Sequence, residues 1–331
     1  MTHPDAEEPV KLRSFDVRGG NSFLLHAAHL VVKHAFSESV SGVIELDAGE
    51  DAYQTSGATF GSNGPNIFDV QEAYATYTSP FGLSFTGGKF VTYEGIEVIE
   101  GPMNPTITRG FLFGLAEPFS YIGAKVHYSI TDGDKEMANL GVGVVNGWDS
   151  YVDNNDAKTL IFRVGVTPID QFWVAASGSF GAERPDSNDD RRLSLDLTGA
   201  VIPHEMITIN FQANYGMEKD IPNPTPSLVD GSWVGFGIQP VFKYEEFSAG
   251  LRFEYFIDNG GSRTQNWGTD TNVWNVTLTP GYTFDEKLQF RAEFRYDGSN
   301  ETVYLGDIDD AGDQEFLDAQ YTIAAAVAYM F

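Results

Sequence analysis

The 331-residue sequence contains no cysteine, few basic residues and no long hydrophobic run. Without cysteine there can be no disulfide framework, thiolate metal site or cysteine nucleophile. Lys and Arg number 20 against 47 Asp and Glu, so the net charge is −27. This charge excludes binding to a nucleic-acid backbone, which needs clustered basic residues. The longest apolar run, Ile323 to Phe331, is far shorter than the roughly 20 residues of a transmembrane helix.

Apolar and polar residues instead alternate at period two in segment after segment. Ile207, Ile209 and Phe211, for example, share one face of an extended chain, and the intervening Thr208 and Asn210 share the other. This pattern predicts an all-β protein. The fifteen strands that we expect lie at 22–36, 40–49, 67–78, 83–91, 119–130, 136–147, 158–166, 172–181, 191–201, 207–216, 232–244, 247–257, 273–283, 288–296 and 319–331.

The connections between these strands alternate strictly between short turns and long loops. Such regular segregation is typical of a transmembrane antiparallel up-and-down β-barrel, with tight turns at one end and long loops at the other. The last strand ends in the aromatic residue Phe331, and aromatic residues near other strand ends fit interfacial girdles. We therefore expect residues 1–331 to form a single barrel domain with an N-terminal segment at 1–21.

An odd strand number conflicts with the even number of bacterial single-chain barrels. Because the strand at 22–36 must run from the loop end to the turn end, a sixteenth strand is expected before it. Either part of 8–17 fills this place imperfectly, or the sequence lacks that strand. We favour the second alternative.

Several stretches resemble the OmpL-like β-barrel porin family of Gram-negative bacteria, and the resemblance covers nearly the whole chain. The stretches are Gln71–Tyr77, Gly88–Phe90, Glu94–Glu97, Val145–Asp149, Asp153–Asn155, Arg252–Asp258, Gly260–Gly261 and Arg291–Asp297. The resemblance implies an outer-membrane passive diffusion channel, about sixteen-stranded, embedded in lipid and lipopolysaccharide and either monomeric or trimeric. Members usually carry a signal peptide and a further strand ahead of the Arg13–Asp16 region.

The longest connection between expected strands is 92–118. It becomes the third external loop if one strand precedes residue 22. In general porins that loop folds inward and narrows the pore. Its charged residues are Glu94, Glu97, Glu100 and Arg109. Its apolar stretch Phe111–Phe113 has no favourable place in open water, so we favour inward folding over a mobile external loop.

Six basic residues fall on the polar parity of their strands and should face the lumen: Lys125, Arg163, Lys243, Arg252, Arg291 and Arg295. One interpretation is a basic wall opposite the carboxylates of loop 92–118, which would create a transverse field. The other is local pairing with lumenal acids such as Glu254 and Glu293. The sequence leaves both open.

The long loops hold 26 Asp and Glu against four basic residues, so an external mouth would be strongly electronegative. One acidic loop places Asp307, Asp309 and Asp313 at a spacing that slightly resembles a calcium loop. The glutamate that this motif has at its twelfth position is absent, and we favour a solvated acidic loop.

The sequence contains no GxSxG elbow, HExxH motif, P-loop or dinucleotide fingerprint. We therefore expect a non-enzymatic porin for small hydrophilic solutes and ions. The alternatives are a sleeve for a partner such as a multihaem cytochrome conduit, an outer-membrane enzyme, and a nonconducting structural or adhesin barrel.

Overall fold

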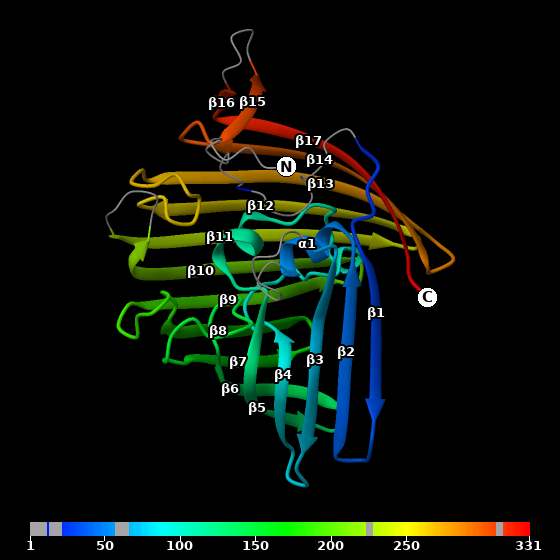
Figure 1. Cartoon of the computed structure of the whole chain (residues 1–331). Coiled ribbons are helices and arrows are strands. Elements are labelled where there is room, and N and C mark those ends of the chain that lie inside the picture. The colour runs from blue at the N-terminus through cyan, green and yellow to red at the C-terminus, as the bar shows by residue number, and fades with distance from the viewer. Residues whose placement is uncertain (1–11, 13–21, 57–65, 223–227, 309–313) are drawn as a thin grey trace.

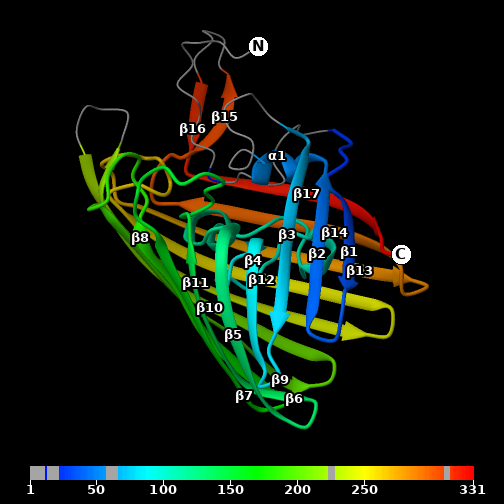
Figure 2. The ribbon, with the colours of Figure 1, turned by 60° about the horizontal axis from the view of Figure 1, so that its bottom comes forward.

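The architecture is one antiparallel sheet of fifteen strands in sequence order, β1 to β14 followed by β17. The computed structural model describes residues 12, 22–56, 66–222, 228–308 and 314–331. The sheet curls round so that β17 returns toward β1 (Figures 1 and 2). Its strands are β1 (Ala28–Ala35), β2 (Val40–Ala48), β3 (Phe68–Thr78), β4 (Leu83–Val91), β5 (Ser120–Asp132), β6 (Lys135–Val145), β7 (Thr159–Ile169), β8 (Phe172–Ala182), β9 (Arg191–His204), β10 (Ile207–Pro222), β11 (Leu228–Tyr244), β12 (Phe247–Asn259), β13 (Thr271–Phe284), β14 (Leu288–Ser299) and β17 (Ala319–Tyr329).

The expected strand order and the alternation of tight turns with long loops are confirmed. Each neighbour pair is antiparallel, and several tight turns use residues in the left-handed region, such as Gly133 (φ 61°) and Glu245 (φ 50°). The sequence pattern missed helix α1 (Glu50–Ser56) and the hairpin of β15 (Tyr304–Ile308) and β16 (Gln314–Leu317). Both lie inside long connections, where the period-two alternation stops.

The edges of the main sheet are β1 and β17 among the described residues. The candidate strand at 8–17 lies outside those residues, apart from Leu12, which packs in an apolar cluster with Phe111 and Trp233. No helix in the described ranges is both long and apolar enough to cross a membrane.

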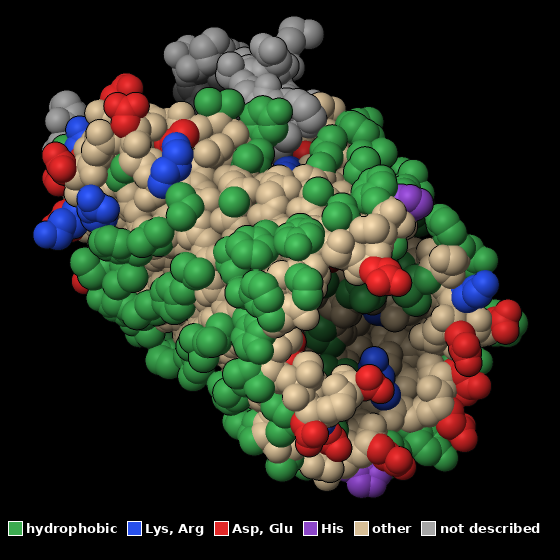
Figure 3. All heavy atoms as spheres, turned by 90° about the horizontal axis from the view of Figure 1, so that it is seen from below, with side chains coloured by type: hydrophobic (Ala, Val, Ile, Leu, Met, Phe, Trp, Pro, Cys, Tyr) green, Lys and Arg blue, Asp and Glu red, His purple; other side chains and the backbone are tan. Residues whose placement is uncertain are grey.

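Burial is inverted relative to a water-soluble protein. Outward side chains such as Val142 and Phe294 are apolar and about half exposed, at 55% and 51%, whereas the inward Thr277 and Arg295 are fully buried. Apolar side chains gather on the outer surface in Figure 3, and a hollow holding charged side chains opens beside them. A sheet with apolar outward side chains and polar inward side chains matches a lipid exterior and a hydrated interior. The fold is therefore a transmembrane β-barrel.

This inversion predicts a depth-dependent penalty for charge on the outer face. Leu278 lies in the middle of β13 and Phe284 at its turn end, both outward and exposed. Leu278→Arg should destabilise the barrel by about 2–4 kcal/mol and Phe284→Arg by roughly 0–1 kcal/mol, because the membrane is driest at its midplane. Urea unfolding of the protein in lipid vesicles measures both. Equal penalties would contradict a lipid-facing β13.

Candidate functional site

Residues 92–118, which we call the inward segment, leave the wall after β4, enter the lumen and rejoin the wall at β5. The inward segment contains two short helical turns, η1 (Gly101–Met103) and η2 (Leu112–Ala116). Its backbone and side chains contact strands β9 to β14, which come much later in the sequence. It crosses the interior of the barrel in Figure 2.

Arg252 on β12 is the central contact of the inward segment. Its Nη1 atom lies 2.8 Å from Oε1 of Glu97 and 2.8 Å from Oγ1 of Thr106, and it also donates to the carbonyl oxygen of Thr108. The side chain of Arg252 is fully buried. A charge taken out of water needs such partners, because an unpaired buried guanidinium is very costly.

Two further arginines of β14 hold the same stretch of backbone. Arg291 donates from Nη1 to the carbonyl of Asn104 at 2.9 Å and from Nη2 to that of Gly101 at 3.2 Å. Arg295 donates from Nη1 to the carbonyl of Arg109 at 2.5 Å and from Nε to Asp297 at 2.6 Å. The planar guanidinium fork suits this multidentate capture of carbonyl groups.

The wall also supplies carboxylates for the backbone N–H groups of the inward segment. Glu293 accepts from the N–H groups of Ile107 at 2.6 Å and Thr108 at 3.2 Å. Glu254 accepts from the N–H groups of Phe111 at 2.6 Å and Leu112 at 3.3 Å. Side chains of the wall thus supply hydrogen-bond partners for the irregular backbone inside the barrel.

An apolar contact completes the attachment. Phe111 and Leu112 are buried in one cluster with Trp233, Phe256 and Val273 of the wall. The position of Gly235 on β11 leaves room for this contact, because a Cβ atom there would lie 3.1 Å from Cγ of Leu112. The first two residues of the apolar stretch Phe111–Phe113 therefore lie against the inner wall.

The two ends of the inward segment meet at a buried group of carboxyls. Glu94 accepts from Ser194 and, at 3.3 Å, from Tyr121. Glu117 accepts from Gln212 at 2.7 Å, and the same amide donates to Asp196 at 2.9 Å. Burial raises the pKa of Glu94 to about 7 and that of Glu117 well above its usual range, with the Asp196 carboxylate adding to both rises.

The loop acids and the wall arginines do not face each other across water, as a transverse field would require. Glu94, Glu97 and Arg109 are all buried, and Glu97 is in direct contact with Arg252. Arg109 pairs with Asp51 of α1 at 2.7 Å, and Glu100 is half-buried. The apolar stretch pulls the inward segment onto the wall, so opposite charges meet as pairs. The sequence pattern predicts Glu254 and Glu293 as local partners of the wall arginines. For Asp196 and Asp51 it gives only the polar parity of the first and the long-loop position of the second.

The other predicted basic residues are more open. Lys125 and Arg163 are half-buried on β5 and β7, and Lys243 is exposed on β11. Lys243 and Arg291 line a cavity of about 230 Å³ beneath η1, together with Met103 and Ser248. The structure therefore divides the six basic residues into three arginines covered by the inward segment and three side chains with access to water.

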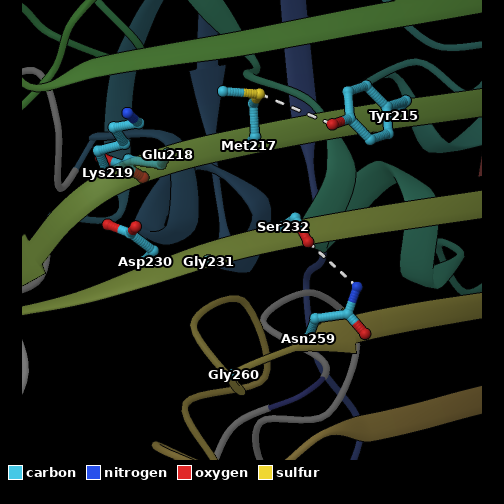
Figure 4. A pocket seen from close by; sticks show the side chains of 9 residues that line it. All are labelled: Tyr215, Met217, Glu218, Lys219, Asp230, Gly231, Ser232, Asn259 and Gly260. Atoms are coloured by element: carbon cyan, nitrogen blue, oxygen red, sulfur yellow. Dashed lines mark hydrogen bonds between the residues drawn. The ribbon is translucent and has the colours of Figure 1, made fainter.

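A second pocket, of about 300 Å³, lies outside the lumen. Figure 4 shows its lining on β10 to β12, with Tyr215 and Met217 on the outer face of β10 and the hydrogen bond between Ser232 and Asn259 beside them. Because Glu218 points inward to Arg192 at 2.8 Å, the alternating neighbours Met217 and Lys219 point outward. This pocket is not part of the pore.

For the weakly predicted calcium loop, Asp307 belongs to β15, and Asp309 and Asp313 lie outside the described residues. Within the described part of the chain, no group of three or more His, Asp or Glu side chains is arranged to hold a metal ion.

Comparison with known proteins agrees with this architecture. The family model described as "Putative beta-barrel porin-2, OmpL-like" matches residues 2–331. The chain belongs to this family. It is a β-barrel porin of the bacterial outer membrane.

Solved structures similar to this porin show the same fold at low sequence identity. The anion-selective porin from Comamonas acidovorans superimposes with a TM-score of 0.62 at 10% identity, covering 92% of this chain and 90% of that one. The trimer form of OmpT, an outer membrane protein of Vibrio cholerae, gives 0.56 at 16% identity, with 92% and 91% covered. The outer membrane channel DcaP of Acinetobacter baumannii gives 0.56 at 13% identity, with 90% and 84% covered. No curated protein sequence matches the porin.

Removing the central cation should destabilise the porin strongly. Arg252→Leu leaves Glu97 buried without its cationic partner, and we expect a loss of about 3–5 kcal/mol in the free energy of unfolding. Lys243→Leu, at an exposed wall position, is the matched control and should change it by less than about 0.5 kcal/mol. Urea unfolding monitored by tryptophan fluorescence measures both. Similar small losses would mean that the Arg252 contacts contribute little.

The Glu94 site predicts a pH dependence with a defined sign. The folded porin keeps a proton on Glu94 up to about pH 7, whereas the unfolded chain releases it near 4.5. The contribution of Glu94 to stability therefore falls as the pH rises from 4.5 to 7 and is flat above that. The total loss of stability over this pH range is on the order of 3 kcal/mol.

Glu94→Gln should remove this slope, so the difference in unfolding free energy between the parent porin and the variant should change between pH 5 and pH 7.5. Urea unfolding at both pH values measures it. A pH-independent difference would show that Glu94 is ionised throughout.

Proposed function

We propose that this porin is a passive diffusion channel whose width is set by the inward segment. The observation that carries the proposal is the attachment of a single segment to one side of the lumen, through Arg252, Arg291 and Glu293, while a hollow opens on the barrel interior (Figure 3). A segment fixed to the wall narrows the passage without a moving part. Small hydrophilic solutes then pass down their gradients, and the lining charges select among them.

The barrel carries out no chemistry in this proposal. A contact between a histidine and a serine does occur in the lumen, where Nε2 of His127 lies 3.2 Å from Oγ of Ser129. The carboxylate of Glu136, however, accepts its hydrogen bond from Ser129 rather than from His127. A catalytic triad needs the acid to orient the imidazole, and this arrangement lacks that contact.

A sleeve around a protein partner is less well supported than a channel. Such a sleeve needs a wide lumen, and here Phe111, Leu112 and Arg252 occupy part of it as a packed layer. For assembly we propose a homotrimer, with support from the similar fold of the OmpT trimer form of Vibrio cholerae. Contacts with outer-membrane lipid and lipopolysaccharide stay a prediction.

Planar-bilayer recording tests the channel directly. The parent porin should give stable single-channel steps, and replacing residues 98–107 by a short Gly-Ser linker should raise the conductance about twofold, because the narrowest cross-section widens. The matched control removes an equal number of residues from the β15–β16 hairpin, which projects from the loop end in Figure 1, and should leave the conductance unchanged.

Folding of each variant is checked by its heat-dependent shift in gel mobility. Silence of the folded parent porin would overturn the diffusion-channel proposal. An unchanged conductance in the linker variant would show that another element sets the width.

A further inference from the structure

The lumen wall opposite the arginine contacts carries two cations that the inward segment covers only in part, through Tyr93. Lys125 lies on β5 and Arg163 on β7, about half-way round the sheet from β12 and β14. Their register places them on one face. Lys125 pairs with Gly143 of β6, and Arg163 pairs with Gly141, two residues along the same strand. Alternation therefore sends all four residues to the same side of the sheet.

That side is the lumen. The Nζ atom of Lys125 lies 4.1 Å from the ring centroid of Phe90 and 4.6 Å from that of Tyr93, and Phe90 is buried in an interior cluster with Tyr121. Arg163 donates from Nη1 to the carbonyl of Tyr93 at 3.1 Å. Because both cations point inward and both are half-buried rather than fully buried, their exposed parts face lumenal water.

The two cations are close enough to act together. Strand spacing and rise put their Cα atoms roughly 12 Å apart, and both side chains contact Tyr93, Lys125 at its ring and Arg163 at its carbonyl oxygen. The charge of Arg163 acts on Lys125. Two like charges side by side are unfavourable unless an anion approaches them.

The described part of the chain does not supply that anion as an ion pair. Among the described residues, no carboxylate oxygen lies within 4.0 Å of either cation. The acids that act on them from a distance are Glu72, Glu136 and Asp196. Each already accepts other hydrogen bonds, from the N–H of Val91, from Ser129 and Asn139, and from the N–H of Gly95, Gln212 and Asn214, respectively.

We infer that Lys125 and Arg163 form an anion-attracting subsite of the lumen, and that the channel passes small anions, such as chloride and short carboxylates, in preference to cations. This inference rests on the proposed channel function and adds the solute class. It runs against the net charge of −27. The inward acids Glu94 and Glu97 are buried and bonded, so they contribute little to the field in the passage.

Reversal potentials in a tenfold KCl gradient test the inference. The parent porin should prefer chloride over potassium, and the double variant Lys125→Gln/Arg163→Gln should lower the permeability ratio of chloride to potassium by about threefold or more. The control is Arg191→Gln/Lys219→Gln, which removes the same two residue types. Lys219 is exposed on the outer face of β10, and Arg191 is exposed and lies 5.4 Å from the ring of Phe180, an exposed outer residue. This control should leave the ratio unchanged.

A second measurement keeps the inference testable if the double variant folds poorly. The swap Lys125→Arg/Arg163→Lys retains both charges and should retain the chloride preference. Citrate added to the bath should interrupt the currents of the parent porin and of the swap variant with similar frequency.

A conducting parent porin that prefers potassium, or equal shifts in the lumen and outer-face variants, would overturn the anion subsite and leave the channel proposal standing. A folded parent porin without current would overturn the channel proposal, and the anion subsite with it.

Discussion

The interior of this porin depends on guanidinium groups that hold the backbone of the inward segment. A chain that leaves a β-barrel wall loses the sheet partners of its peptide groups, and those groups must find others. Arg252, Arg291 and Arg295 donate to its carbonyl oxygens, while Glu254 and Glu293 accept from its N–H groups. The wall thus replaces the missing strand neighbours with charged side chains on alternate positions of β12 and β14.

This exchange explains why buried charge is tolerated in the lumen. Each guanidinium offers five donors in a fixed plane, and the peptide carbonyls, hydroxyls and carboxylates around it accept from several of them, which offsets much of its lost hydration. The outer surface shows the opposite requirement. Lipid supplies no hydrogen bonds, so outward positions such as Leu278 and Phe294 are apolar, and the strands satisfy their backbone among themselves. The same period-two pattern therefore places apolar side chains against lipid and polar side chains against the lumen.

Period-two alternation predicted the strands and their order because it reports a constraint that acts at every residue of a barrel wall. It could not predict α1 or the β15–β16 hairpin, since these elements lie in loops where neither lipid nor lumen imposes a pattern. The basic residues of the lumen followed from parity alone. Which of them meet water did not, because Arg252 and Lys125 have the same parity signal but differ in how far the inward segment covers them: Arg252 is fully buried, whereas Lys125 is half-buried beside Tyr93. That difference depends on contacts more than 140 residues apart in sequence.

The position of the inward segment also decides which charges a solute meets. Coulomb interactions are strong and specific over a few ångströms and are screened beyond about 8–10 Å at physiological salt. Acidic loops at the mouth raise the local concentration of cations, but the passage itself is governed by the groups within that distance of the solute. Pairing of Glu97 with Arg252 cancels two charges in place. Lys125 and Arg163 carry no such pairing among the described residues, so the inferred anion subsite has the opposite sign to the net charge of the molecule.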